Sequence, residues 1–185
     1  MLIVIMDKQK LKISVLKWTQ GDVSSFSVLY DYYVDKIYRF IYFKVPDGEA
    51  EDLTEDVFLK VMQKKHTFDP DKSAFSTWIY TIARNTVIDF LRTNKATTEL
   101  SDFIVDTDSN KDIVSNVDKN FELLNLKKAI SCLPKDKQDL VVLRFVDELS
   151  YDEMSQILNK SEGSIRISMM RTLKELRVIL EKLET

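Results

Sequence analysis

Residues that break helices and form turns are very scarce in this chain. Its 185 residues include only three glycines and three prolines, whereas these two types together make up roughly 12% of an average protein. A sandwich or barrel of many short strands needs a turn about every 8–12 residues, and too few turn residues are present to supply them. The composition therefore predicts an all-α protein built from long helices.

Composition also excludes several classes of function. With one cysteine, Cys132, and one histidine, His66, the chain can form neither an internal disulfide framework nor a zinc site of several such ligands. No stretch approaches the roughly eighteen apolar residues of a membrane span, and the apolar start over residues 1–6 is shorter than a signal peptide. We therefore expect a cytoplasmic protein that uses no metal and no cofactor.

Charge is arranged in blocks, although the net charge is only −3. Residues 45–58 carry six acidic side chains and no basic one, and residues 99–122 carry seven acidic against two basic ones. Residues 60–95 carry seven basic against three acidic ones, and residues 160–182 carry six against three. Two basic segments are thus separated by an acidic one. This is compatible with a nucleic-acid partner and equally with charges scattered over solvated helix faces.

Apolar residues recur at three- and four-residue steps in the first half, which predicts helices. These span about residues 22–45, 49–65 and 74–94. A loop is expected over 68–71, and Ser73 is suited to cap the third helix. Residues 96–119 are rich in threonine, serine, asparagine and aspartate without a helical period, which predicts a flexible acidic linker.

The second half carries clear helix boundaries. A helix is expected from about Phe121 to Cys132, and Pro134 opens another over 134–146. Ser150 and Glu153 have the spacing of a capping box, which starts a short helix to Leu158. Ser161 can cap a last long helix that ends near Leu183. We therefore predict two small helical domains, 22–95 and 120–185, preceded by an extension over 1–21 and joined by the linker 96–119.

The stretch 151–176 has the spacing of a helix-turn-helix. Ser155 is small enough for a close helix crossing, Asn159 tolerates a positive φ in the turn, and Ile165 faces the first helix. We expect the apolar seam to be completed by Met154, Ile157, Leu158, Met169 and Leu173. The opposite face of the second helix presents Ser164, Ile167, Arg171 and Lys174, with Arg166 and Ser168 on its flanks. Such residues read base edges and phosphates in the major groove, but a helical hairpin that binds only protein would show the same apolar stripe.

A second polar face lies on the predicted helix 74–94. It consists of Thr77, Thr81, Arg84, Asn85, Ile88 and Arg92, and the preceding loop adds Phe68, Lys72 and Ser73. Cations can follow a nucleic-acid backbone, an exposed aromatic ring can stack on an unpaired base, and asparagine can pair with a base edge. This favours single-stranded nucleic acid as the ligand, whereas Phe75 and Trp78 are expected in the core.

The acidic helix 49–65 allows two interpretations. Carboxylates surround its apolar positions; the residues concerned are Glu51, Asp52, Leu53, Glu55, Asp56 and Phe58. Acidic residues interact well with the dipole of a solvated helix N-terminus. They would equally form a docking surface for a basic partner helix, and the sequence leaves both open.

Three passages in the same order resemble the extracytoplasmic-function (ECF) group of sigma factors. They are AEDLTEDVF over 50–58, FSTWIYTIARNT over 75–86 and LSYDEM over 149–154. The resemblance runs from about Phe26 to Leu180. It implies that residues 22–95 form the family's region 2 and residues 120–185 its region 4, with the linker running through RNA polymerase toward the RNA exit path.

The resemblance also implies partners and site residues. The acidic helix would dock on the clamp helices of the largest subunit of core RNA polymerase, and region 4 on the flap. The loop 68–73 and the face from Thr77 to Arg92 would melt the −10 element of promoter DNA, holding a flipped base near Phe68 and Asn85. The −35 element would meet the helix-turn-helix face with Ser161 at its start. An anti-sigma factor would be a further partner, and no small-molecule substrate is implied.

Some features depart from the family pattern or leave alternatives. Many relatives carry a small polar residue and a base where this chain has Ile167 and Ser168, so its −35 sequence is open. The alternatives are a free-standing regulator that binds duplex DNA alone and an adaptor that binds only protein. We expect no enzyme, because the acidic cluster in 51–56 has no histidine or cysteine beside it.

Overall fold

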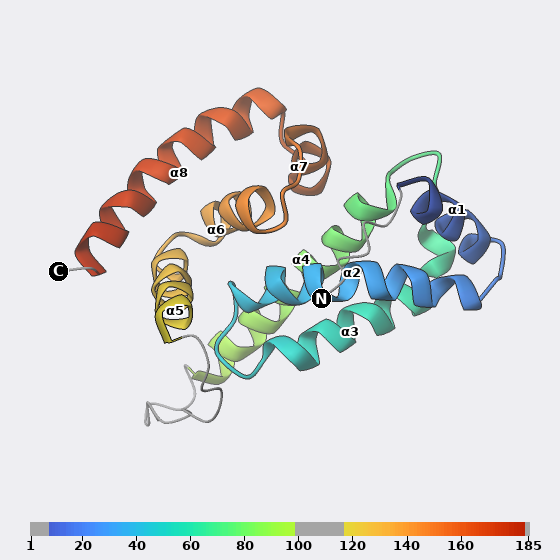
Figure 1. Ribbon diagram of the computed structural model, residues 1–185, viewed down its shortest axis with the longest axis horizontal. Coiled ribbons are helices and arrows are strands. Elements are labelled where there is room, and N and C mark those ends of the chain that lie inside the picture. Colours follow the sequence, from blue (N-terminus) through green and yellow to red (C-terminus); the bar gives the residue numbers. More distant parts are fainter. Residues whose placement is uncertain (1–7, 99–116, 184–185) are drawn as a thin grey trace.

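The first half of the chain forms a bundle in which α2 (Ser24–Tyr42), α3 (Ala50–Gln63) and α4 (Phe75–Thr98) pack on one another (Figure 1). The computed structural model describes residues 8–98 and 117–183, and most of the predicted linker, 99–116, lies outside the described residues. All regular elements within those ranges are helical, which confirms the predicted fold class. None of the described helices combines the length and apolarity that crossing a membrane requires.

An additional helix, α1 (Lys8–Thr19), packs against α2 and contributes to the core of this bundle. Trp18 is 1% exposed, and its ring lies 5.7 Å from that of Phe75 and 6.2 Å from that of Trp78. The tight connections on either side of α2 use two of the three glycines. Gly21 (φ +110°) and Gly48 (φ +87°) both occupy the region that favours glycine.

The second half contains α5 (Val117–Ser131), α6 (Lys135–Val141), α7 (Tyr151–Leu158) and α8 (Glu162–Leu183). The expected helix 134–146 is interrupted, because α6 ends at Val141 and continues as a π-helical turn, η2 (Val142–Val146). The start of α7 agrees with prediction. Ser150 and Glu153 form the reciprocal capping box, and Asn159 ends the helix with φ +51°.

The phase of α8 differs from the expected apolar seam by one position. Ile165 and Met169 are buried as predicted, but Leu173 is 38% exposed, whereas Thr172 and Leu176 are buried. Steps of four, three and four residues keep one face of an α-helix inward. Thr172 tolerates burial because its hydroxyl donates a 2.9 Å hydrogen bond to the carbonyl of Ser168.

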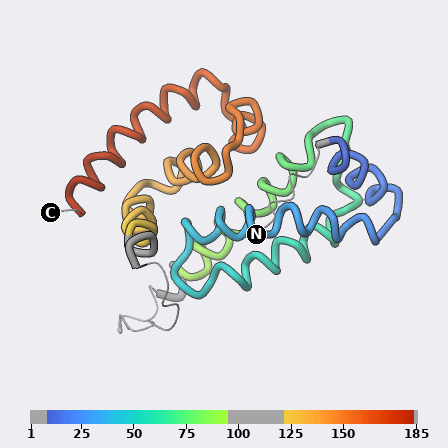
Figure 2. The backbone as a smooth tube through the Cα atoms, in the orientation of Figure 1, coloured from blue at the N-terminus to red at the C-terminus, as the bar shows by residue number. Residues whose placement is uncertain are grey.

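The two halves pack directly against each other. α7 contacts α4, and η2 contacts α2. Figures 1 and 2 show the second half on one side of α2 and α4, with α3 on the other side of the bundle. The second half therefore covers part of the first half, and in particular the start of α4.

Substituting Trp18 tests whether α1 belongs to the folded domain. Trp18→Ala should lower the free energy of unfolding by about 3–5 kcal/mol, the usual cost of removing a buried aromatic side chain. Urea denaturation followed by circular dichroism measures this. Ile13→Ala is the matched control on the same helix; Ile13 is 52% exposed, and we expect a change within about 0.5 kcal/mol. An equally small change in the free energy of unfolding for both substitutions would show that α1 does not stabilise the folded domain.

Candidate nucleic-acid interface

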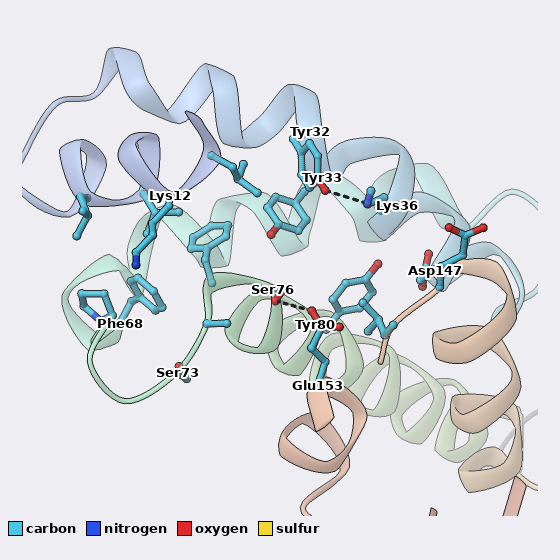
Figure 3. Close-up of a pocket in the computed structure, with 18 residues that line it drawn as sticks. Lys12, Tyr32, Tyr33, Lys36, Phe68, Ser73, Ser76, Tyr80, Asp147 and Glu153 are labelled. Atoms are coloured by element: carbon cyan, nitrogen blue, oxygen red, sulfur yellow. Dashed lines mark hydrogen bonds between the residues drawn. The ribbon is translucent and has the colours of Figure 1, made fainter. Parts of the chain in front are cut away.

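The first turns of α4 are covered by α7. The Thr77 hydroxyl lies 3.2 Å from Oε1 of Gln156, and the Ser76 hydroxyl lies 3.4 Å from Oε1 of Glu153 (Figure 3 shows the second pair). Thr77 is buried. The sequence predicted Thr77 on a face that meets nucleic acid, and in this arrangement that end of the face meets region 151–158 instead.

A buried carboxylate from α6 holds the middle of the same face. Asp139 pairs through one oxygen with Lys44, which follows α2, and accepts a 2.8 Å hydrogen bond from Nε of Arg84 on α4 through the other. Lys44 and Asp139 are both almost fully buried, whereas the side chain of Arg84 is 30% exposed. Burial lowers the pKa of Lys44, and the negative charge of Asp139 opposes that shift. Arg84 therefore lies on the predicted face, but its guanidinium is already paired with Asp139.

The remaining predicted positions on α4 lie further along the helix and are more open. Thr81 is half-buried and donates a 2.8 Å hydrogen bond to the carbonyl of Thr77. Asn85 and Ile88 are exposed, and exposed Arg92 lies 3.2 Å from Asp89. The face thus has a covered beginning and an open end.

The aromatic residue of the preceding loop is not exposed, contrary to the expectation for Phe68. It is 7% exposed, and its ring lies 5.5 Å from that of Phe75 and 5.1 Å from that of Trp78. These edge-to-face and tilted contacts stabilise the loop against the start of α4. Lys72 in the same loop is exposed and pairs with Asp69 at 3.0 Å.

A cavity of about 650 Å³ lies beside this loop, between α1, α2 and the second half of the chain (Figure 3). Its walls mix polar and apolar side chains, and the aromatic ones include Tyr32, Tyr33, Phe68 and Phe75. Ser73, predicted to contact nucleic acid, also lines it, and Glu153 and Asp147 close it from the second half. Sequence patterns gave no sign of this cavity, because its residues come from separate elements.

Asp147 is an acidic side chain that lines this cavity. It is buried, and neither carboxylate oxygen has a hydrogen-bond partner in the described part of the chain. Burial raises the pKa of its carboxyl to about 7, although Arg39 and Lys36 act in the opposite direction. Glu148, the next residue, adopts φ +58°, which is unusual for a residue other than glycine. The connection from η2 to α7 is therefore strained and polar.

The outward face of α8 carries the residues that the sequence predicted for a recognition helix. Ser164, Ile167, Arg171 and Lys174 are exposed and Ser168 is half-buried. The Ser161 hydroxyl accepts a 3.3 Å hydrogen bond from the amide of Ser164, as a helix cap does. Exposed Arg166 lies over the ring of Tyr151, 4.1 Å from its centre. Sequence reasoning missed Met170, which is 63% exposed on this helix.

The acidic face of α3 is open to solvent at Glu51, Asp52 and Glu55. Asp56 is half-buried and pairs with Lys60 at 2.7 Å. Two residues predicted for this surface belong to the core instead, because Leu53 and Phe58 are buried, the latter with its ring 4.7 Å from that of Tyr30. Sequence reasoning missed Leu59 and Met62, which are 59% and 41% exposed on the same helix.

The described residues contain no group of three or more side chains arranged to hold a metal ion. α4 and α8 carry cations, hydroxyls and an amide, and α3 carries carboxylates around exposed apolar side chains. These faces suit nucleic acid and a basic protein surface respectively.

Solved structures share this fold. CnrH in complex with the cytosolic domain of CnrY superposes with a TM-score of 0.72 at 18% identity, covering 94% of this chain and 98% of that one. The sigma factor RpoE from Bartonella quintana, in complex with the anti-sigma factor NepR, gives 0.71 at 23% identity, covering 86% and 98%.

Sequence relatives define the family. Residues 29–97 match Sigma-70 region 2, and residues 123–176 match Sigma-70 region 4. The ECF RNA polymerase sigma factor BldN of Streptomyces coelicolor is 34% identical over 86% of this chain, which spans 62% of that protein. The ECF RNA polymerase sigma factor SigW of Bacillus subtilis is 31% identical over 89% of this chain and 93% of its own length. The chain therefore belongs to the ECF group of RNA polymerase sigma factors.

Proposed function

We propose that this chain directs core RNA polymerase to specific promoters and helps to open them, with α8 at the −35 duplex and α4 at the melted −10 strand. The observation that carries this proposal is the two-sided character of α8. Its inner positions Ile165 and Met169 are buried in the helix-turn-helix seam, while Arg171 and Lys174 are exposed on the outer face. A helix held in this way can enter the major groove without disturbing its own domain.

The −10 site would consist of the open end of α4 together with the loop before it. Asn85 is exposed and available for a base edge, and Arg84 offers a cation for the backbone once released. Unstacking a base costs a few kcal/mol, and stacking on a protein ring returns about 1–3 kcal/mol. Strand opening is thus driven by binding energy. We infer that the chain itself catalyses no reaction and acts in the cytoplasm, beside RNA polymerase.

The face of α3 is proposed as the polymerase-binding surface. Glu51 and Glu55 lie on the same side of the helix as Leu59 and Met62, at spacings of four and three residues. Carboxylates around an exposed apolar centre suit a basic helical partner. The inner side of α3 packs on α2 and α4, and its outer side is exposed. This surface therefore stays accessible while region 4 covers the start of α4.

Protein inhibition is also proposed. CnrH and RpoE were each solved with a bound protein, and for RpoE that protein is an anti-sigma factor. The same two-domain fold in this chain supports a similar partner, which would hold the domains in a state that cannot bind promoter DNA.

Run-off transcription from a promoter library tests the function directly. Core polymerase with this protein should yield transcripts that start downstream of a shared pair of promoter elements, and core polymerase alone should not. Gel-shift assays of the protein alone on the same DNA form the second arm. Tight duplex binding without stimulated transcription would favour the free-standing regulator instead.

Arg171 tests the role of α8. In holoenzyme, Arg171→Ala should weaken promoter binding and, if it contacts only phosphate, lower the salt slope of log K by about 0.9 for duplex DNA. The effect should then be nearly equal across promoter sequences, whereas a base contact would give a loss of about 1–3 kcal/mol at one position. Arg177→Ala is the matched control, since Arg177 is exposed on the same helix and pairs with Glu181. Equal promoter binding by the two variants would show that Arg171 does not contact DNA.

Asp139 tests whether region 4 blocks the −10 site. Removing one partner of a buried ion pair typically costs about 3–5 kcal/mol, so Asp139→Asn should separate the domains. Small-angle X-ray scattering should then give a larger radius of gyration, and the isolated protein should bind single-stranded −10 DNA more tightly. Asp136→Asn is the control, because Asp136 is exposed on the same helix. If both variants keep the dimensions and affinity of the unsubstituted protein, the ion pair does not hold the domains together.

A further inference from the structure

The N-terminal helix α1 belongs structurally to region 2, although the match to Sigma-70 region 2 starts only at residue 29. Val15 and Trp18 are buried, and the Trp18 ring contacts Phe75 at the start of α4. Trp18 also receives Lys65 over its ring at 5.5 Å. These contacts fix α1 beside the loop that is proposed to hold the −10 strand, as Figure 1 shows.

The charge of α1 is not explained by packing. The helix carries four lysines and no acidic residue; they are Lys8, Lys10, Lys12 and Lys17. Its inward face needs only Ser14, Val15 and Trp18, which are the buried positions. A uniformly cationic helix fixed against a nucleic-acid site has the charge that would complement a phosphate backbone.

One of these lysines lies at the cavity. Lys12 lines it together with Leu11 and Val15 of α1 and with Phe68 of the loop. Figure 3 shows the Lys12 side chain reaching from α1 toward Phe68. The other lysine that lines the cavity, Lys36, is already engaged, since it donates to the Tyr32 hydroxyl at 3.3 Å and lies over the same ring.

Region 4 supplies carboxylates to the opposite side of this cavity. Glu153 lines it and contacts Ser76, and Asp147 lines it as a buried carboxyl. When region 4 moves away, as the proposed function requires, these acidic groups leave and the cations remain. The surface that region 2 contributes to the cavity is then open, and it combines aromatic side chains, among them Tyr32 and Phe68, with Lys12 at its edge. Aromatic side chains of this kind can stack on an unpaired base.

We propose that Lys12 binds a phosphate of the non-template strand next to the base held in this cavity, which makes α1 part of the strand-binding site. This inference rests on the proposed function of region 2 and adds to it a helix outside the matched region. The ligand is single-stranded DNA, bound through its backbone and therefore without sequence preference at this contact.

The test compares Lys12→Gln with Lys17→Gln in holoenzyme. The probe is a forked promoter DNA with a single-stranded −10 non-template segment, titrated at several KCl concentrations. Lys12→Gln should weaken binding several-fold at low salt and lower the salt slope by about 0.7, the value for one phosphate contact on a single strand. Lys17 is exposed on α1 but does not line the cavity, so Lys17→Gln should leave both quantities unchanged. Lys12→Arg should restore them.

The outcomes separate this inference from the function on which it rests. If unsubstituted holoenzyme neither binds the fork nor transcribes, the proposed function fails and the role of α1 fails with it. If unsubstituted holoenzyme binds and transcribes but Lys12→Gln matches Lys17→Gln, only the role of Lys12 is overturned. An equal loss in both variants would show a diffuse effect of charge, which also contradicts a contact at Lys12.

Discussion

Ion pairs connect the two domains, and the buried ones centre on Asp139, whereas Lys127 pairs with the exposed Asp47. Asp139 neutralises Lys44 and binds Arg84, so one side chain of region 4 connects the end of α2 with the middle of α4. A buried charge is costly unless it is paired. Lys44 and Arg84 therefore each need another partner, or water, when Asp139 moves away. In the proposed function, a DNA phosphate replaces Asp139 as the partner of Arg84, because a guanidinium matches the geometry of a phosphate as well as that of a carboxylate. Lys44 would regain water. Opening is then an exchange of partners rather than a simple loss of contacts.

The two kinds of contact in the molecule differ in character. Within region 2, Trp18, Phe68 and Phe75 hold the elements together by aromatic packing that water cannot replace. Between the domains, Thr77 meets Gln156 and Ser76 meets Glu153 through hydrogen bonds, beside the ion pairs of Asp139 and the apolar residues of both halves that share one buried cluster. Polar contacts exchange readily with water or a ligand because their net contribution is only about 0.5–1.5 kcal/mol each. This difference supports the proposal that region 2 keeps its fold when these hydrogen bonds to region 4 are exchanged.

Local signals predicted the helices and the recognition motif, and they failed where distant residues decide the outcome. The capping box at Ser150 and the turn at Asn159 are encoded within a few residues and could be identified directly. Thr172 rather than Leu173 is buried in the seam because of the phase of the helix and because one hydrogen bond satisfies the Thr172 hydroxyl. The burial of Phe68 depends on Trp78, ten residues away in another element. The covering of Arg84 requires Asp139, 55 residues further along the chain, and no local pattern contains that pairing.

The distribution of open and covered faces implies an order of binding. The carboxylates of α3 are exposed in the closed arrangement, whereas Thr77 and Arg84 on α4 are occupied by region 4. If α3 binds polymerase and α4 binds DNA as proposed, a basic polymerase surface can bind first, and DNA can bind α4 only after region 4 has moved. We therefore expect affinity for promoter DNA to appear when polymerase holds the domains apart, which would confine strand opening to the assembled holoenzyme.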